Sequence, residues 1–335
     1  MATNTSLFPW VPVSQSHADI HPATMEPGAD EVAAFDYAPE HFRVYKSGMI
    51  DRSSRQLLVT KGVNDATGVT FKDVVLDAGT GLSVRLFLPN LHEQHPKKKL
   101  PVLVYFHGGG FITEWSFSAT YHNYVFSLPV AAGVLAMTVD CRHHDYLASL
   151  AAAAGVLAVF VGYRRLAFDF EHPLPAAPYD DCWAALRWAV SSARDNDDEW
   201  VAAHGDTARV FVAGDSAGGN IVRNLLARAA ADEGVPRIEG AILLHPSACP
   251  DDDPQFNPEL ERLGCKRMMV CAAEKYRPAP RVRAYHGAAA GSACEGNTEW
   301  METEWEEEHM FFLLHPEGDR AKALMDRVVA FIAAA

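Results

Sequence analysis

The amino-acid sequence predicts an α/β fold with a mostly parallel, doubly wound sheet. Two stretches carry this prediction, RVFVAGDSAGGN at residues 209–220 and LPVLVYFHGGGF at residues 100–111. Each begins as a short apolar strand and ends in a glycine-rich turn. In the first stretch, an alanine-rich helix is expected to follow at residues 217–231. Strands that alternate with helices in this way form parallel sheets covered by helices on both faces.

The turn at residues 214–218 has the G-x-S-x-G pattern of a nucleophile elbow. Ser216 stands at the apex of a sharp strand-to-helix turn, where bulky side chains two positions away would clash. Gly214 and Gly218 relieve that crowding. The amino terminus of the following helix favours negative charge near the serine. The pattern therefore indicates that Ser216 is a catalytic nucleophile.

A glycine run supports the same chemistry. Gly108, Gly109 and Gly110 come directly after the strand predicted at residues 100–106, so their N–H groups are free to face a ligand oxygen. In α/β-hydrolases such a run supplies an oxyanion hole, together with the N–H of the residue after the nucleophile. We therefore expect Gly109, Gly110 and Ala217 to hold a developing oxyanion.

The remaining elements fit around these motifs. Alternating apolar residues predict a hairpin, and longer apolar patterns predict a helix and two buried strands. These elements are expected at residues 72–89, 178–193, 238–244 and 268–273. The helix places Trp183, Leu186 and Trp188 on or near its buried side.

Two neighbouring segments resemble each other at a constant offset, residues 124–142 (the upstream unit) and residues 146–164 (the downstream unit). The sequence AAGVLA at residues 131–136 recurs unchanged at residues 153–158. Each unit is expected to form a helix followed by a buried strand. Two copies do not make a solenoid, so we interpret them as a local duplication. The sheet must then take an extra strand or exclude one unit, and the sequence leaves that choice open.

Further stretches match one known family, and together they cover most of the chain from about residue 30 to the end. They lie at residues 35–37, 42–45, 67–77, 105–111, 171–181, 214–220, 240–246 and 325–331. In these stretches the chain resembles the plant carboxylesterases of the hormone-sensitive-lipase-like branch of α/β-hydrolases. That group also contains the gibberellin receptors. The family has one helix–strand unit where this chain has two.

The resemblance implies two-step acyl transfer on small ester substrates, without a cofactor or a metal. His309 falls at the position of the family's general base, which takes the proton of the serine as it attacks the ester carbonyl. Tyr276 stands where the family has its acidic residue. Loss of that carboxylate alone costs on the order of 10⁴ in kcat in serine proteases.

Three interpretations stay open. The first is a carboxylesterase whose activity is weakened by Tyr276. The second is a catalytically impaired, small-molecule-binding protein like the gibberellin receptors, which typically alter the histidine rather than the acid. The third is a chain damaged by the duplication and by a cap segment shortened at residues 247–258. Retention of Ser216 and His309 favours the first over the second, and the oligomeric state stays open.

Composition sets bounds on partners and location. The formal net charge of −14 over 335 residues argues against nucleic acid and anionic membrane surfaces as partners. The six cysteines lack any C-x-x-C pairing, which favours a reducing compartment. No apolar run is long enough to span a bilayer. We expect a cytoplasmic location, with the nucleus also allowed, and no secretory signal.

The N-terminal region differs in character from the rest. Residues 1–28 are polar and rich in proline, so we expect a disordered extension. A transit peptide fits the few acidic residues there but not the absence of arginine. A single hydrolase domain is expected at residues 29–335, with a cap segment at residues 29–66. The histidines His107, His172 and His245 are expected to hold loops by hydrogen bonding.

Overall fold

The computed structural model describes part of the chain in detail. The described residues are 43–44, 50–51, 61–90, 99–111, 139–164, 176–232, 234–247, 264–273, 282–283, 285–287, 298–303 and 309–334. The chain divides into two compact units, residues 1–55 with 167–171 and residues 56–166 with 172–335. In the first unit, β1 (Arg43–Val44) pairs antiparallel with β2 (Ile50–Asp51). The predicted N-terminal extension and most of the predicted cap segment lie outside the described residues.

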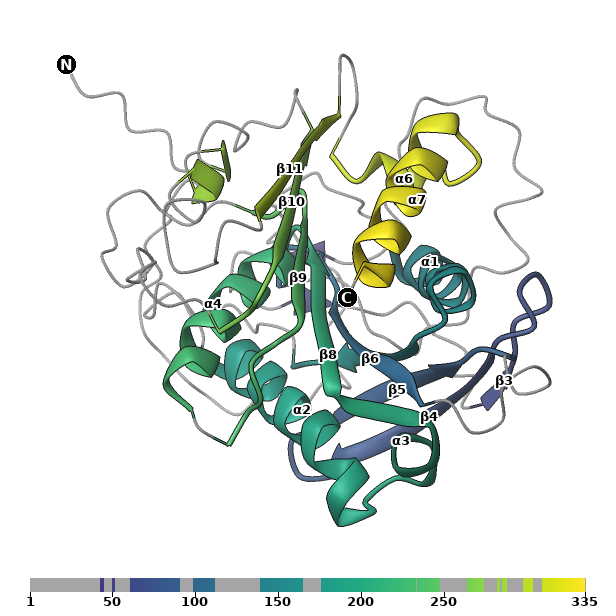
Figure 1. Ribbon diagram of the computed structural model, residues 1–335, viewed down its shortest axis with the longest axis vertical. Helices are drawn as coiled ribbons and strands as arrows, with labels where there is room; N and C mark the ends of the chain where they lie inside the picture. The colour runs from purple at the N-terminus through teal and green to yellow at the C-terminus, as the bar shows by residue number, and fades with distance from the viewer. Residues whose placement is uncertain are drawn as a thin grey trace, which may run out of the picture. The chain divides into compact units, whose positions relative to one another are not determined.

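The second unit is built on a nine-stranded sheet with the order β11-β10-β9-β8-β6-β7-β5-β4-β3 (Figure 1). Strands β6 to β11 run parallel to one another, and β5, β4 and β3 extend the sheet beyond β7 in antiparallel pairs. The strands are β3 (Lys61–Val63), β4 (Thr70–Asp77), β5 (Leu82–Leu88), β6 (Leu100–Phe106), β7 (Leu157–Gly162), β8 (Gly205–Asp215), β9 (Gly240–Leu244), β10 (Met268–Ala273) and β11 (Thr298–Thr303). The predicted mostly parallel sheet is confirmed.

Helices cover both faces of this sheet (Figure 1). On one face lie α2 (Ala176–Asp195) and α4 (Ala217–Ala231), and on the other α1 (Val139–Ala154), α6 (Phe311–Leu314) and α7 (Asp319–Ala333). The short α3 (Glu199–His204) precedes β8. Because side chains alternate along a strand, Val104 packs toward α2 and α4, whereas its neighbour Tyr105 packs toward α1. Each face therefore has its own apolar core.

The predicted elements agree with the structure where apolar runs are sharply bounded. The strands at residues 100–106 and 268–273 and the helix at residues 217–231 are confirmed at both ends. The strand predicted at residues 238–244 begins at Gly240, since Ile238 forms only an isolated bridge with Cys265.

The downstream unit supplies the strand of the sheet. Its C-terminal part forms β7, which lies between β6 and β5. Residues 124–138 of the upstream unit lie outside the described residues. The last four residues of that unit, 139–142, were predicted to end a buried strand, but they form the first turn of α1. That prediction was wrong, because β6 already pairs with β8 on one side and β7 on the other.

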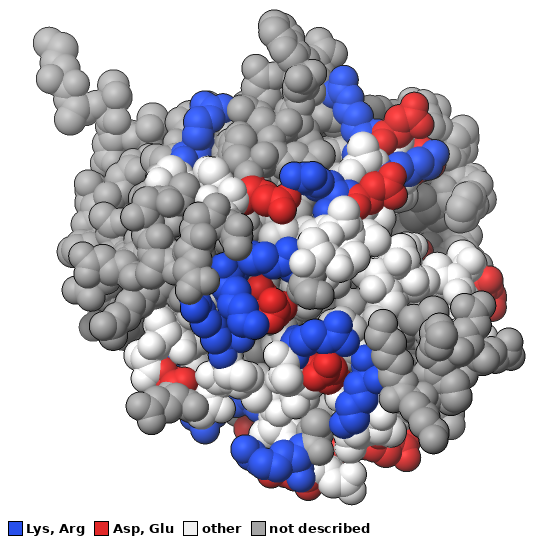
Figure 2. All heavy atoms as spheres, viewed as in Figure 1, with Lys and Arg blue, Asp and Glu red and all other residues white. Residues whose placement is uncertain are grey.

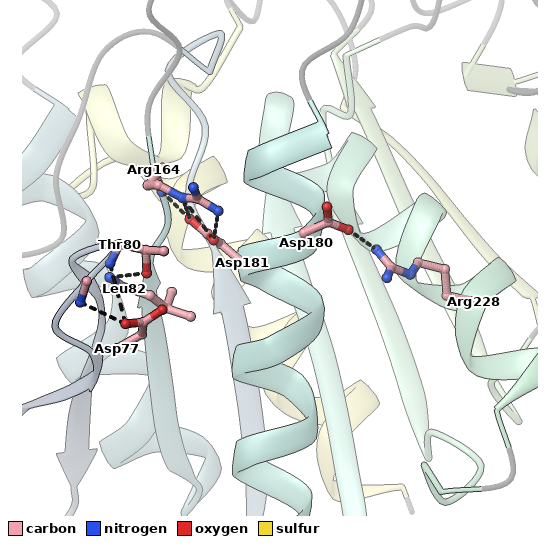
Figure 3. A network of polar contacts seen from close by, with 8 residues as sticks. Asp77, Thr80, Leu82, Arg164, Asp180, Asp181 and Arg228 are labelled. Carbon is pink, nitrogen blue, oxygen red and sulfur yellow. Dashed lines mark hydrogen bonds and ion pairs between the residues drawn. The ribbon is translucent and has the colours of Figure 1, made fainter.

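Arg164, just after β7, ties the strand to the helical layer (Figure 3). Its guanidinium donates to both carboxylate oxygens of Asp181 in α2, at 2.7 and 2.9 Å, and its backbone N–H donates to Asp181 Oδ2 at 2.8 Å. A second ion pair, Arg228 with Asp180 at 3.0 Å, joins α4 to α2. Paired guanidinium–carboxylate contacts of this kind fix orientation as well as distance. The end of β7 is therefore held in a defined place.

Three further observations concern the surface, the cysteines and the helices. Figure 2 shows basic and acidic side chains interspersed on one face of the molecule. Cys182, Cys265 and Cys271 are buried and are not in disulfide bonds. Within the part of the chain that is described, no helix has the length and apolar character needed to cross a membrane.

Candidate active site

Ser216 lies in the strained turn between β8 and α4. Its backbone has φ 48° and ψ −114°, a left-handed conformation that non-glycine residues rarely adopt. The chain is so crowded here that a Cβ on Gly218 would lie 1.9 Å from the carbonyl oxygen of Phe106. A Cβ on Gly214 would lie 2.5 Å from the carbonyl carbon of Gly218. Only glycine fits at either position, and the predicted elbow is present.

The end of β9 holds this turn in place. The N–H of Ser216 donates to the carbonyl of Leu244 at 3.0 Å, and the N–H of Ser247 donates to the carbonyl of Ser216 at 2.8 Å. Both the N–H and the carbonyl of the strained residue are thus hydrogen-bonded, one to the end of β9 and the other to the segment that follows it. Such support is what allows an unfavourable backbone conformation to persist.

His309 meets Ser216 from the other side of the site. Its Nε2 lies 2.9 Å from Ser216 Oγ. The next residue, Met310, has φ 67° and donates its N–H to Nδ1 of His245 at 3.1 Å. His245 follows β9, is fully buried, and donates its backbone N–H to the carbonyl of Cys271 at 2.8 Å. The prediction that His245 holds a loop by hydrogen bonding is confirmed, and the loop is the one that carries His309.

Burial keeps both histidines neutral at pH 7. Removal from solvent lowers the pKa of His309 to about 4, against a smaller opposing effect from the charge of Asp215. Burial likewise lowers the pKa of His245 to about 3. Because Nδ1 of His245 accepts from Met310, its proton is assigned to Nε2. A neutral His309 is in the state that can accept a proton from a serine.

The glycine run bends beside the elbow. Gly109, Gly110 and Phe111 have φ values of 91°, 60° and 65°. Two carbonyls before this bend, those of His107 and Gly108, accept from the hydroxyl of Tyr163 at 2.8 and 3.2 Å.

Tyr163 also sets the direction of the next amide. Its ring stacks on the imidazole of His107 with centroids 4.2 Å apart. Since C=O and N–H point in opposite directions across a trans peptide, the N–H of Gly109 points away from Tyr163. A Cβ on Gly108 would lie 3.1 Å from Cβ of Ser216, so the run lies directly against the serine. Its position fits the predicted donors Gly109 and Gly110, and Ala217 begins α4 on the other side.

One buried group near the serine was missed in the sequence. Asp215 is fully buried and accepts from Tyr105 Oη and from His143 Nε2, each at 2.8 Å. The available signal was an acidic residue that follows the apolar run at residues 210–213. The predicted acid position, Tyr276, lies outside the described residues, as do residues 304–308 before His309 and the predicted loop histidine His172.

The sheet, the elbow and the glycine run define an α/β-hydrolase. Solved esterase structures share this fold. Esterase LipW from Mycobacterium marinum has a TM-score of 0.58 and 23% identity, over 80% of this chain and 82% of that one. An esterase from Pyrobaculum calidifontis has a TM-score of 0.58 and 20% identity, over 82% and 86%.

The family is defined by sequence relatives. A model described as alpha/beta hydrolase fold matches residues 139–286. Tuliposide A-converting enzyme 1, chloroplastic, from Tulipa gesneriana is 38% identical over 326 residues, covering 86% of this chain and 75% of the relative. Probable carboxylesterase 4, mitochondrial, from Arabidopsis thaliana is 35% identical over 334 residues, covering 88% and 82%. The chain belongs to the plant carboxylesterases of the hormone-sensitive-lipase-like α/β-hydrolases, and it is a carboxylic ester hydrolase.

The relatives also correct the predicted location. We expected a cytoplasmic protein, but the names of similar proteins place them in chloroplasts, amyloplasts or mitochondria. The prediction rested on the lack of arginine in residues 1–28 and on the cysteine pattern. Neither feature distinguishes a cytosolic protein from one that resides in the reducing interior of an organelle.

Proposed function

We propose that the protein hydrolyses small carboxylic esters with Ser216 as the nucleophile and His309 as the general base. The observation that carries this proposal is the 2.9 Å contact between His309 Nε2 and Ser216 Oγ at a strained elbow. A nucleophile and a base within hydrogen-bond reach are the signature of activated serine catalysis. The alternative of a small-molecule-binding protein receives no support from the relatives above, whose names describe carboxylesterases and converting enzymes.

The reaction follows two acyl-transfer steps. His309 takes the proton of Ser216 as its oxygen attacks the ester carbonyl, and the N–H groups of Gly109, Gly110 and Ala217 receive the oxyanion. Collapse of the tetrahedral intermediate expels the alcohol, which receives the proton from His309. Water then attacks the acyl-enzyme with His309 again as base, and the acid is released.

The test is hydrolysis of a p-nitrophenyl ester series by the parent and by Ser216→Ala. We expect Ser216→Ala to lower kcat/KM by at least about 10³-fold, since the nucleophile is lost. Ser191→Ala is the matched control, because Ser191 lies on α2 and donates to the carbonyl of Trp188 in the same helix. A fluorophosphonate should label Ser216 and no other serine. Full activity in Ser216→Ala would refute the proposal.

We further propose that activity is weak because the acid position holds Tyr276. A tyrosine hydroxyl is neutral at pH 7, so it offers no charge to stabilise the imidazolium of His309. Tyr276→Asp should raise kcat/KM about tenfold to a hundredfold, part of the loss that follows removal of a triad acid. An unchanged rate in a well-folded Tyr276→Asp variant would show that another carboxylate serves His309.

We also propose an organellar location, by analogy with the chloroplastic and mitochondrial relatives. The full chain with green fluorescent protein at its C-terminus should enter plastids or mitochondria of plant cells. A uniform signal through the cytosol would contradict this part of the proposal.

A further inference from the structure

A buried polar cluster lies directly behind the nucleophile and has no part in the steps above. Its centre is Asp215, the last residue of β8. The carboxylate accepts from Tyr105 Oη of β6 and from His143 Nε2 of α1, each at 2.8 Å. Asp215 and His143 are both 0% exposed. Three elements of the fold, β6, β8 and α1, therefore meet at the carboxylate of the residue that immediately precedes Ser216 in the chain.

We propose that His143 and Asp215 are positioning residues for the reaction: His143 fixes the Asp215 carboxylate, and that carboxylate orients the elbow and acts on His309 through its negative charge. The inference rests on the proposed roles of Ser216 and His309. It identifies two residues, one of them just before the downstream unit, that act on the reaction without contacting the substrate.

The packing around Asp215 links it to the glycine run. A Cβ on Gly108 would lie 2.4 Å from Asp215 Oδ2 and 3.1 Å from Ser216 Cβ. The carboxylate thus occupies the space beneath the run, and the run lies against both the carboxylate and the serine. A shift of Asp215 would move Ser216 through the chain and the glycine run through this contact. Displacement of reacting groups by about 1 Å can cost about a hundredfold in rate.

The electrostatics agree with this geometry. Burial by itself raises the pKa of Asp215, but the charge and hydrogen bond of His143 and the hydroxyl of Tyr105 hold it below its usual value. The ionised carboxylate in turn raises the pKa of His309, opposing burial. The titratable groups that act on Asp215 or feel its charge are Tyr105, His107, His143, Tyr146, His245 and His309.

His143 distinguishes the segment that builds the sheet. At the offset that relates the two units, His143 corresponds to Tyr121 upstream, and the following residues His144 and Tyr146 correspond to His122 and Tyr124. A tyrosine in this place can donate a hydrogen bond but carries no positive charge at pH 7. The downstream unit, which enters the sheet, is therefore preceded by a histidine whose hydrogen bond and charge both act on the buried Asp215.

The kinetic test compares His143→Phe, which removes the donor, with His143→Gln, which keeps a neutral donor. We expect His143→Phe to lower kcat at least about tenfold with little change in KM, and His143→Gln to retain most of kcat. His144→Phe is the matched control on the next residue of α1, and we expect it to leave kcat unchanged. Equal kcat in His143→Phe and the parent would overturn the proposal.

A double variant shows whether His143 acts through Asp215. Asp215→Asn should lower kcat, and adding His143→Phe to it should lower kcat little further, because the target of His143 is already gone. If the two reductions multiply instead, His143 acts independently and the proposal is wrong. His143→Gln and Asp215→Asn alter few atoms, so they keep the test valid if His143→Phe fails to fold.

The pH dependence of activity distinguishes a specific effect of Asp215 on His309 from a general loss of structure. Removal of the negative charge in Asp215→Asn should lower the pKa of His309, and the acid limb of kcat/KM should move to lower pH. Assays started by a jump from pH 7 limit acid unfolding. The same titration, followed by ¹⁵N-histidine NMR with His309→Gln to assign the signal, needs no turnover. It therefore tests the inference even if Ser216→Ala refutes the proposed function. A His309 pKa that is unchanged by Asp215→Asn would overturn the inference.

Discussion

The upstream and downstream units are most alike in their small residues. They differ at positions that the structure buries in α1 and β7 or uses to hold the glycine run. Ala151, buried in α1, corresponds to Pro129 upstream, and Phe160, buried in β7, corresponds to Thr138. Tyr163, which holds the carbonyls of the glycine run, corresponds to Cys141. The downstream unit therefore has the helix, the core residue and the loop contact that this position in the sheet requires.

The comparison teaches that sequence identity between repeats does not decide which one enters a fold. The shared AAGVLA segment supplies only small and apolar side chains that either unit can bury. A proline inside a helix removes a hydrogen bond and clashes with the preceding turn, at a cost of about 3 kcal/mol. The shared segment favours neither unit, so a few residues outside it decide which unit forms the helix and strand.

The largest effect is expected when the upstream residue is placed in the helix. Ala151→Pro should destabilise the protein by about 3 kcal/mol or more, a large part of a typical free energy of unfolding. Ala152→Val, which also introduces the upstream residue but at a half-buried position, should cost less than about 1 kcal/mol. Urea unfolding of both variants gives the comparison. Equal stability would mean that Pro129 does not exclude the upstream unit.

A smaller effect is expected at the loop contact. Tyr163→Phe removes the hydroxyl that donates to two carbonyls, so we expect a loss of about 1 kcal/mol in stability. Because the glycine run is less well held, kcat should fall about tenfold.

Tyr146→Phe is the control for this change. The Tyr146 hydroxyl is buried and has no hydrogen-bond partner among the described residues, so its removal should not destabilise the protein. A kcat for Tyr163→Phe that matches Tyr146→Phe would exclude a role for Tyr163 in holding the run.

The smallest effect is expected when one unit is deleted. Removal of residues 121–142 joins Thr120 to His143 and leaves a single unit, so the midpoint of thermal unfolding should stay within a few degrees of the parent or rise. Removal of residues 124–145 gives a chain of the same length that has Tyr121 and Asn123 in place of His143 and Asp145. If both shortened chains unfold, the upstream unit is integral to the fold.

Much of the fold followed from local patterns. The strand at residues 100–106 and the helix at residues 217–231 are short, uniform in character and bounded by glycine turns, so their ends were predicted correctly. The choice between the two units was not predicted, although Pro129 was visible as a helix-breaking residue. The helical start of α1 at residues 139–142 was missed because the repeat suggested a second strand there.

The candidate site was predicted in part. Ser216 and His309 were identified from a motif and from position in a family, and the structure brings them together. The pair of His143 and Asp215 was not, because no motif in the sequence links its members, which are 72 residues apart. Only the packing of α1 against the end of β8 reveals that contact. A buried acid next to a nucleophile looks, in sequence, like one more residue of the turn.

The position of β7 has a consequence for synthesis on the ribosome. Its neighbour β6 precedes both units in the chain, and Tyr124 leaves the ribosome 22 residues ahead of Tyr146. At about 5–20 residues per second, that lead lasts roughly one to four seconds, far longer than the microseconds in which helices and hairpins form. The upstream unit thus has the first opportunity to pair with β6, before its competitor exists. In a complete chain that refolds from denaturant, both units are present at once. Only during translation, therefore, does the upstream unit have time to pair with β6 in the absence of the downstream unit.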